Sequence, residues 1–579
     1  MKVLLIYPYF LDRRIHESEI SVPPTGLYYV GAMLAHHGYP VEIFNWYDVD
    51  RRPDEIEAGL RNAAPDVVGF SILHANRWGG LDLAAAAKRL NPRVNIVFGG
   101  IGATFLWRHL LRHFAVVDYI VPGEGERTFL KLVQWLESRP AGADSPPLRG
   151  IAFRKNGVPV KNDPAAPISN LDDLPDPALY FRFQHVAFSR GCPGACTFCG
   201  SPDFWGRRVR AHSPRYAVDQ LARLKKMGVQ HFFFNDDTFT LDRERVAAIC
   251  RDIWKRRLNI TWVAISRVDA VNESVLTWMR KAGCTQISYG IESGAEVIRR
   301  RLGKSIRTAR IEQAFAMTTR CGILPRAYFI YGSPGETLQT IEETIALMDR
   351  IKPLSAVFYI LDLFPGTRLY QEVKRRHGFS DDIWLRRVED ILYFEMDATL
   401  RREQVLDFGR RLREAFHRRL PAYAASIVLN PDPDLNELHA DFLSRLGMTF
   451  SHGDYAAIDA IPDKEVAAES LYRRALDRFP HPRAYLGLGM LHQRRRRFAA
   501  STAVLSEGRI RFPDDIDLAV CQGINHLNLN DPVRALECFA PHAADPRAAP
   551  YVAECRRRIN SGRSGPSPLS AEYDHGPGP

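Results

Sequence analysis

The chain has 579 residues, of which 46% are hydrophobic and 25% charged, and its formal net charge is +11. This length is too great for one hydrophobic core and predicts three or four domains, and the composition is that of an ordinary soluble globular protein. No apolar run reaches the roughly 18 residues that span a bilayer, and the N-terminal MKVLLIYPYF lacks a signal cleavage site, so we expect a cytoplasmic protein without a transmembrane segment. The basic surplus is expected on solvated helix faces, and since no basic-aromatic module is present we expect no nucleic-acid partner.

Residues 1–137 alternate short β-rich runs with amphipathic helical stretches, which predicts an α/β domain with a doubly wound, Rossmann-like parallel sheet. Small residues follow several of these strands, at Ser71, Gly99–Gly100 and Gly123–Glu126. Ligands of such sheets bind at the carboxyl ends of the strands, and glycines there let a large flat ligand approach the backbone. Each glycine alone could instead serve only a tight turn. The five predicted strands are KVLLIYP, VEIFNW, DVVGFSIL, VNIVFGG and VDYIVPG.

A linker is predicted over residues 138–183, with a β-hairpin centred on Asn156–Gly157. Residues 184–370 then carry a second series of six βα units, which predicts a partial (βα)6 barrel with its chemistry at the carboxyl ends of the strands. The predicted strands of this series are HVAFSR, VQHFFFND, ITWVAIS, TQISYGIES, ILPRAYFIYG and SAVFYIL.

The C-terminal part is predicted to be all-α. Residues 371–463 form a helical extension, and residues 464–560 show a repeat, since Gly489 and Gly523 are 34 residues apart. A period of 33 to 34 is typical of tetratricopeptide-like helix pairs, which would offer a protein-binding surface or serve as a structural cap. Residues 561–579 have little to bury and are predicted to be disordered.

The segment SRGCPGACTFCG places Cys192, Cys196 and Cys199 in the loop after the first strand of the second series, with the spacing CxxxCxxC. A closed zinc or iron–sulfur site usually takes four protein ligands. A Cys₃His zinc site with His185 or His212 is one interpretation, and a disulfide with a spare thiol is another. The third is a 4Fe-4S cluster in which one iron lacks a protein ligand.

The cysteine motif, with Phe198 before its last cysteine, resembles that of the radical S-adenosylmethionine (SAM) superfamily. The N-terminal half resembles the cobalamin-binding subgroup of that superfamily. The similarity extends over residues 1 to 400 in ten ordered segments: VPPTGLYYVGAMLAHHGY, DVVGFS, VFGG, VDYIVPGEGE, SRGCPGACTFC, FNDDTF, SRVD, GIESG, YGSPGET and FPGTRLY.

By this resemblance the three cysteines ligate three irons of a 4Fe-4S cluster, and the amino and carboxylate groups of SAM chelate the fourth. Asp236 and Asp237 are expected to accept bonds from the methionine ammonium, although Asp237 could be a helix N-cap. Arg267 is expected to bind the methionine carboxylate, with an ion pair to Asp269 as the alternative. Glu292 is expected to bind the ribose hydroxyls. The complete set of expected SAM contacts is Phe198, Asp236, Asp237, Ser266, Arg267, Glu292, Gly332 and Gly335.

The resemblance also implies cobalamin on the carboxyl-end face of the first sheet. No DxHxxG follows the first strand, and His16 stands in RRIHES without the glycine, so we expect no histidine ligand to cobalt and leave its lower axial ligand open. The expected cobalamin contacts are Pro24, Thr25, Gly26, Leu27, Ser71, Gly99, Gly100, Gly123, Glu124, Gly125 and Glu126.

The resemblance implies an enzyme that reductively cleaves SAM to a 5′-deoxyadenosyl radical and transfers a methyl group via methylcobalamin to an unactivated carbon, or phosphorus, of a small-molecule, lipid or natural-product substrate. An electron donor such as flavodoxin or ferredoxin is implied as well. An oxidative cyclase or ring-rearranging enzyme with the same cofactors is the first alternative. A non-catalytic scaffold that presents the helical repeats to a protein partner is the second, and an enzyme held on a lipid surface by its basic helices is the third.

Overall fold

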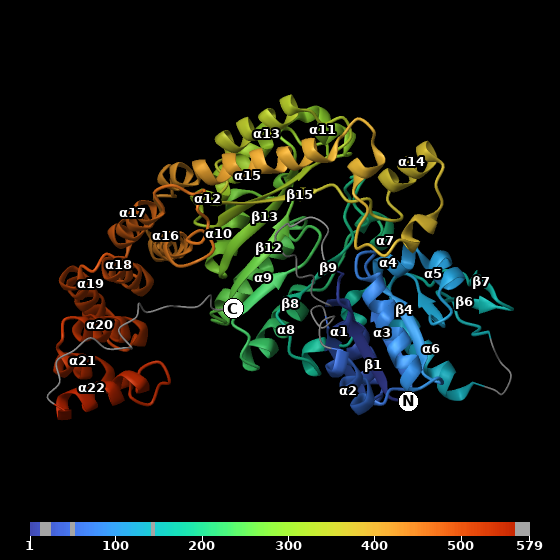
Figure 1. The fold of residues 1–579 in the computed structure, drawn as a ribbon, viewed down its shortest axis with the longest axis horizontal. Helices are drawn as coiled ribbons and strands as arrows, with labels where there is room; N and C mark the ends of the chain where they lie inside the picture. Colours follow the sequence, from blue (N-terminus) through green and yellow to red (C-terminus); the bar gives the residue numbers. More distant parts are fainter. Residues whose placement is uncertain (12–24, 47–52, 140–144, 562–579) are drawn as a thin grey trace.

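The computed structural model describes residues 1–11, 25–46, 53–139 and 145–561, and its N-terminal domain is built on a seven-stranded sheet (Figure 1). Strands β1 to β5 run parallel in the order β2-β1-β3-β4-β5, which confirms the five predicted strands of a doubly wound sheet. The seven strands are β1 (Val3–Tyr7), β2 (Val41–Asn45), β3 (Val67–Ser71), β4 (Asn95–Gly99), β5 (Tyr119–Val121), β6 (Ala152–Lys155) and β7 (Val158–Lys161).

Side chains alternate between the two faces of this sheet, and both faces are buried. Val3, Leu5 and Tyr7 of β1 pack with α1 and α6 on one face. Leu4 and Ile6 point to the other face and lie in the core shared with α2 and α3. The hairpin expected around Asn156–Gly157 is present as β6 and β7, and it pairs antiparallel with β5 at the edge of the sheet. Part of the segment predicted as a linker therefore belongs to the first sheet. The helices are α1 (Thr25–His36), α2 (Pro53–Ala63), α3 (Arg77–Leu90), α4 (Gly100–Phe105), α5 (Trp107–His113) and α6 (Glu126–Ser138).

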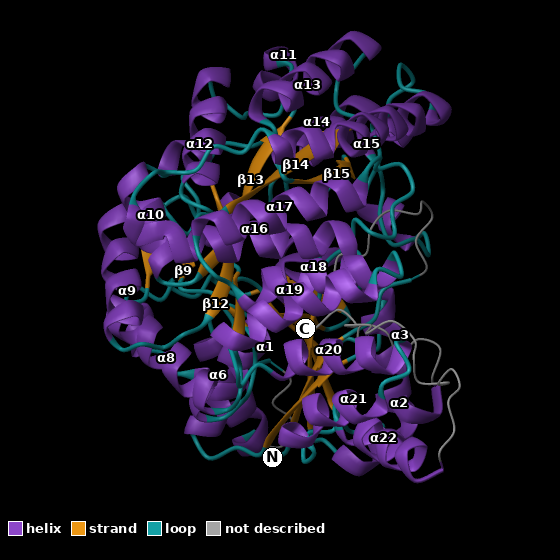
Figure 2. Ribbon diagram, turned by 90° about the vertical axis from the view of Figure 1, so that its left-hand side faces the viewer, coloured by secondary structure: helices purple, strands orange, loops and turns teal. Residues whose placement is uncertain are grey.

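The central domain contains an open sheet of six parallel strands that follow one another in chain order. Helices α8, α9, α10 and α12 lie along its outer side (Figure 2). The strands are β8 (His185–Val186), β11 (His231–Phe234), β12 (Thr261–Ser266), β13 (Cys284–Glu292), β14 (Leu324–Tyr331) and β15 (Ser355–Ile360). The helices are α7 (Ser201–Trp205), α8 (Pro214–Lys226), α9 (Arg243–Lys255), α10 (Glu273–Lys281), α11 (Glu296–Arg301), α12 (Thr308–Arg320) and α13 (Leu338–Ile351). A short ribbon of β9 (Ser189–Arg190) and β10 (Arg210–Ala211) stands beside this sheet.

The C-terminal region is helical, and α17 to α22 form an arm that extends from the central domain (Figure 1). Each helix of the arm contacts the next one in the chain. Gly489 and Gly523 take equivalent places in successive pairs, because a β-carbon would meet Leu505 at 2.6 Å in one and Phe539 at 2.3 Å in the other. The helices are α14 (Arg368–His377), α15 (Arg402–Ala425), α16 (Asn436–Ser451), α17 (Lys464–Arg478), α18 (Pro482–Arg494), α19 (Phe498–Arg511), α20 (Ile516–Asn528), α21 (Pro532–Phe539) and α22 (Ala549–Ser561).

Short 3-10 helices occur at η1 (Leu171–Asp173), η2 (Pro177–Leu179), η3 (Val268–Ala270), η4 (Asp381–Leu385), η5 (Tyr393–Met396), η6 (Pro433–Leu435) and η7 (Ala540–His542). Within the described ranges, none of the helices has the length and apolarity needed to cross a membrane. The tail predicted to be disordered lies, from residue 562 on, outside the described residues.

Candidate functional site

The three clustered cysteines lie in the loop between β9 and α7, on the carboxyl side of β8. Their side chains are partly exposed, whereas the other six cysteines are buried. A β-carbon at Gly194 would lie 3.3 Å from Cys192 Sγ, 3.9 Å from Cys196 Sγ and 3.3 Å from the Arg267 guanidinium. Gly194 thus lies against two of the thiols and against Arg267, where a side chain would be crowded.

The donor set of three thiols in one short loop fits an iron–sulfur cluster, whose usual protein ligands are cysteine thiolates. Burial raises the pKa of Cys199 to about 12 and also raises the pKa of Cys196. Such thiols are protonated at neutral pH, and a bound metal that displaces the proton is what turns them into thiolate ligands.

The alternative of a Cys₃His zinc site finds no support. Among the described residues, no histidine joins the three thiols in a group compact enough for one metal ion. His212 Nδ1 lies 3.1 Å from Asp172 instead, and the His185 ring stacks on Phe233 with centroids 4.4 Å apart.

Asp236 and Asp237, which follow β11, hydrogen-bond to residues at both ends of the cysteine loop. Asp236 is fully buried and accepts hydrogen bonds from the Phe188 amide at 3.2 Å and from the Ser189 hydroxyl. Asp237 accepts from the Ser201 hydroxyl at 2.5 Å. The alternative of an N-cap at Asp237 is wrong, since Asp242 caps the following helix α9. Both carboxylates therefore position the loop that carries the cysteines.

Glu292 ends β13 in a left-handed backbone conformation, with a φ of +67°. Its carboxylate accepts a hydrogen bond from Lys304 Nζ at 2.7 Å, and both side chains are about nine-tenths buried. Burial raises the pKa of Cys196, and the Lys304 charge opposes this effect by lowering it. Lys304 was not among the predicted residues, because no strand end or motif marks it; Gly303, against the Ala195 carbonyl, brings it to the cysteine loop.

Arg267 is paired with Asp269 through a bidentate contact of 2.9 and 2.7 Å, the arrangement named as the alternative to SAM binding. The neighbouring Ser266 is buried, and its hydroxyl lies against Thr240. Arg267 nonetheless faces the cysteine loop, as its closeness to Gly194 shows.

The loop after β14 contains Gly332 and Gly335, both with positive φ (+74° and +69°), where other residues would be strained. Glu336 accepts from the backbone N–H groups of Gly332 and Ser333, and its burial raises its pKa to about 7. Phe198 packs, half-buried, against the hydrophobic core.

A cavity of about 260 Å³ opens at the carboxyl ends of β1, β3, β4 and β5. Thr25 begins α1 and does not line the cavity, and Pro24 lies outside the described residues. A β-carbon at Gly99 would meet no atom closer than 3.8 Å, and one at Gly123 none within 4 Å, so this face is open to a flat ligand. The predicted cobalamin residues that line it are Gly26, Leu27, Ser71, Gly99, Gly100, Gly123, Glu124, Gly125 and Glu126.

The cysteine loop and this cavity adjoin each other. Phe204 and Trp205, on the helix that follows Cys199, form part of the cavity wall. Sequence reasoning missed these two aromatics, although their position five and six residues after the last cysteine marks them as near the cluster loop.

A buried ion-pair network joins the same two elements. Arg190, two residues before Cys192, lies 3.1 Å from Glu124 and 2.5 Å from Glu126, and Arg210 lies 2.8 Å from Glu124. The four side chains are at most 10% exposed. The two glutamates expected to contact cobalamin thus fasten the cavity rim to the cysteine loop.

A cavity for a flat ligand at the carboxyl ends of a doubly wound sheet, joined to a three-cysteine loop on a parallel α/β sheet, defines a two-cofactor α/β enzyme. The chain matches the B12 binding domain over residues 14–133 and the Radical SAM superfamily over residues 186–348. It belongs to the cobalamin-binding radical SAM enzymes, whose cofactors are a 4Fe-4S cluster, SAM and cobalamin.

Named relatives support this membership. The uncharacterized methyltransferase PH0819 of Pyrococcus horikoshii is 32% identical over 384 residues, which are 64% of this chain and 83% of that protein. The anaerobic magnesium-protoporphyrin IX monomethyl ester cyclase of Rubrivivax gelatinosus is 29% identical over 64% of this chain and 70% of its own. The structure of the radical SAM methyltransferase TsrM from Kitasatospora setae, with cobalamin and a 4Fe-4S cluster bound, shares the fold at a TM-score of 0.55 and 19% identity, over 65% of this chain and 75% of its own.

Proposed function

We propose that this enzyme is a methyltransferase acting on an unactivated carbon or phosphorus of a small-molecule, lipid or natural-product substrate. The observation that carries the proposal is the shared wall of the two sites: Phe204 and Trp205 line the cavity and directly follow the cysteine loop. A methyl carrier and a radical source must both reach one substrate, and adjoining sites allow this.

When bound, the reduced cluster and cobalamin supply the electron that cleaves SAM and the carrier for the methyl group. Cys192, Cys196 and Cys199 would hold the cluster, and the open glycine face of the first sheet would hold the corrin. In our proposal Lys304 orients the buried Glu292 carboxylate toward the ribose hydroxyls of SAM. Arg267 would leave its partner Asp269 and bind the methionine carboxylate with the same two hydrogen bonds. Breaking the Arg267–Asp269 ion pair costs little free energy, because the pair is partly exposed to solvent.

Asp236 and Asp237 act one step further from SAM in this proposal. Their hydrogen bonds to Ser189, Phe188 and Ser201 fix the two ends of the cysteine loop. A fixed loop keeps the thiolates at the spacing that the cluster requires, so these aspartates are positioning residues.

The finer architecture belongs to the same proposal. The open six-stranded sheet would be a partial TIM-type barrel with its substrate at the carboxyl ends. The helices α17, α19 and α21 begin at residues 464, 498 and 532, a 34-residue period that supports tetratricopeptide-like repeats and a protein partner for the arm. We propose flavodoxin or ferredoxin as the electron donor.

Anaerobically reconstituted full-length enzyme, given SAM with a deuterated methyl group and a metabolite extract, tests the reaction. We expect a product carrying the deuterated methyl group together with 5′-deoxyadenosine, and neither with Cys196→Ala. A dehydrogenated or cyclised product without label would replace methyl transfer by the cyclase alternative, which the R. gelatinosus relative favours. Protein with its full iron content that releases no 5′-deoxyadenosine would favour a scaffold.

A further inference from the structure

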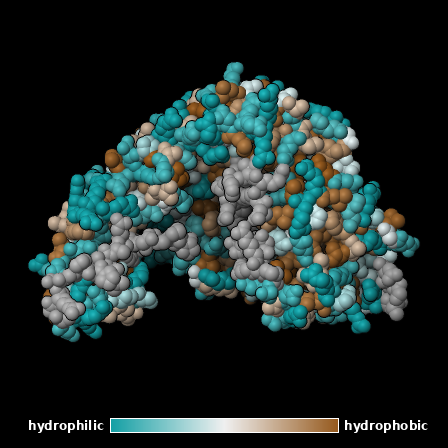
Figure 3. Space-filling view, in the orientation of Figure 1, coloured by the Kyte–Doolittle hydropathy of each residue, from teal (hydrophilic) through white to brown (hydrophobic). Residues whose placement is uncertain are grey.

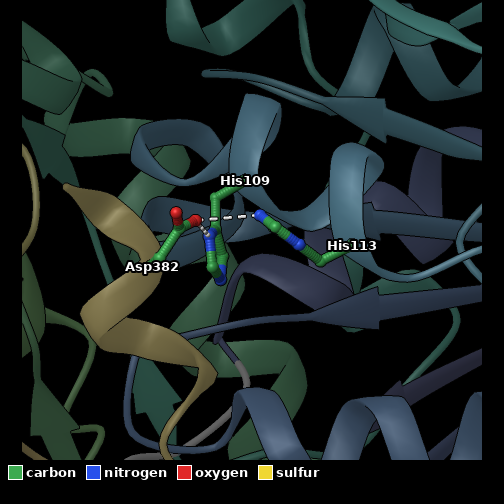
Figure 4. A group of neighbouring side chains, drawn as sticks. All are labelled: His109, His113 and Asp382. Atoms are coloured by element: carbon green, nitrogen blue, oxygen red, sulfur yellow. Dashed lines mark ion pairs between the residues drawn. The ribbon is translucent and has the colours of Figure 1, made fainter.

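A second group of metal-ligating side chains lies on α5, apart from the cysteine loop. His109 and His113 are four residues apart on this helix, so their rings lie on one face of it. Asp382, in the 3-10 helix η4 after the central domain, approaches the same face. Figure 4 shows both rings directed at the Asp382 carboxylate.

The distances suit one shared ion. Asp382 Oδ1 lies 2.9 Å from His113 Nε2 and 3.7 Å from His109 Nδ1, and one ligand atom from each of the three residues lies within 4.8 Å of the others. Ligands at 2.0–2.1 Å from a tetrahedral zinc ion are about 3.3 Å apart. The two measured distances bracket that value, so small side-chain rotations would complete the geometry.

His109 lacks the partners that a buried imidazole normally has. Its side chain is 2% exposed, and within the described ranges neither ring nitrogen makes a hydrogen bond. A buried polar group without a partner is unfavourable and calls for an unseen water or ion.

The group has the remaining properties of a metal site. The side chains of Asp382 and His113 are 52% and 26% exposed, so solvent reaches the open side and can supply a water ligand. Two imidazoles and one carboxylate form a donor set that zinc and related divalent ions prefer.

We propose that His109, His113 and Asp382 bind one divalent transition-metal ion of the zinc class, completed by water. This ion fastens the segment after α14 to the cobalamin-binding domain. The same segment is already held there by Arg77, which donates to the Trp384 carbonyl at 3.3 Å, and by Trp78 Nε1, which donates to Arg386 at 2.9 Å. The site is therefore structural, and it is independent of the methyl-transfer proposal.

The test uses the full-length holoenzyme with its cluster in place, so that the cysteine thiols are occupied. The protein is equilibrated with Zn²⁺ and desalted, and zinc, iron and cobalt are counted together. We expect one zinc per chain for the wild type and for the control His377→Gln, whose histidine is exposed elsewhere. His113→Gln and Asp382→Asn should bind zinc at least tenfold more weakly, with iron and cobalt unchanged, which also shows that they fold.

Two further readouts decide the assignment. Zinc should raise the unfolding temperature of the wild type by a few degrees and leave that of Asp382→Asn unchanged. X-ray absorption at the zinc edge should show nitrogen and oxygen at about 2.0–2.1 Å without sulfur at about 2.3 Å. Wild type without zinc, equal zinc on Asp382→Asn, or a zinc–sulfur shell would each overturn the proposal and leave a simple histidine–aspartate ion pair.

Discussion

Replacing Arg190 with leucine should loosen the contact between the cobalamin cavity and the cysteine loop. Arg190 lies between Glu124 and Glu126, at 3.1 and 2.5 Å. Glu124 would keep Arg210 at 2.8 Å, but the described contacts give Glu126 no other cation. Removing one partner of a buried ion pair typically costs about 3–5 kcal/mol, because it leaves an uncompensated charge.

Hydrogen exchange measures this cost locally, at the amides of the elements that carry the ion pair. Amides of β5 and α6 should exchange at least about 100-fold faster in Arg190→Leu, since each 1.4 kcal/mol is a factor of ten. The matched control is Arg127→Leu, which lies on α6 next to Glu126. Its ion pair with Asp173 is half-exposed at 3.3 Å, so its loss should cost under about 1 kcal/mol.

The double variant Arg190→Leu with Glu126→Leu separates the charge from the packing. An apolar replacement of both partners of a buried pair is often close to neutral, so this variant should recover much of the lost protection. The reasoning is refuted if Arg190→Leu exchanges no faster than Arg127→Leu, or if the double variant is as unprotected as the single one.

Four further changes address the cofactor sites one at a time. Cys196→Ala removes a proposed iron ligand, so iron content and SAM cleavage should be lost while cobalamin absorption stays; full iron content would contradict the proposed ligand set. Gly99→Leu extends a side chain into the cavity and should lower bound cobalamin at least tenfold while 5′-deoxyadenosine release persists. Normal cobalamin content in this variant would contradict the placement of cobalamin in the cavity. Lys304→Met leaves Glu292 buried without its ammonium at 2.7 Å and should weaken SAM binding tenfold or more at unchanged iron content, and unaltered affinity would remove Lys304 from the site. Burial raises the pKa of Glu336 to about 7, so its charged form is disfavoured in the folded state. The free energy of unfolding should therefore fall by up to about 3 kcal/mol as the pH rises from about 4.5 to about 7. Glu336→Gln should raise Tm by an amount that grows over this pH range, and a pH-independent difference would contradict this reasoning.

The open cavity at the strand ends of the first sheet could be predicted from the sequence because local patterns determine it, and its contacts to cobalamin stay a prediction. Parallel strands end at one edge, and the small residues at Ser71, Gly99 and Gly123 mark those ends. The grouping of the cysteines in one loop was equally predictable, since all three lie within eight residues. In both cases spacing along the chain is enough to bring the residues together.

The charged partners could not be predicted, since tertiary packing alone selects them. Arg190 reaches Glu126 across 64 residues, and Asp382 meets His109 across 273. The HxxxH spacing on α5 was visible in the sequence, but only the fold supplies the carboxylate. Lys304 is a similar case, because the close approach of Gly303 to Ala195 brings it to Glu292.

Buried polar contacts hold the cobalamin-binding domain against the segment that follows β15. Arg77 is 1% exposed, and its guanidinium donates to the carbonyls of Trp384, Arg386 and Glu389 at 3.0 to 3.3 Å. His74 Nε2 adds a contact of 2.5 Å to Asp362, at the end of β15. A buried guanidinium fork is satisfied only when its acceptors lie in one arrangement, so these contacts fix how the two domains face each other. These contacts therefore hold the cavity of the first sheet and the cysteine loop next to each other, the arrangement on which the proposed methyl transfer depends.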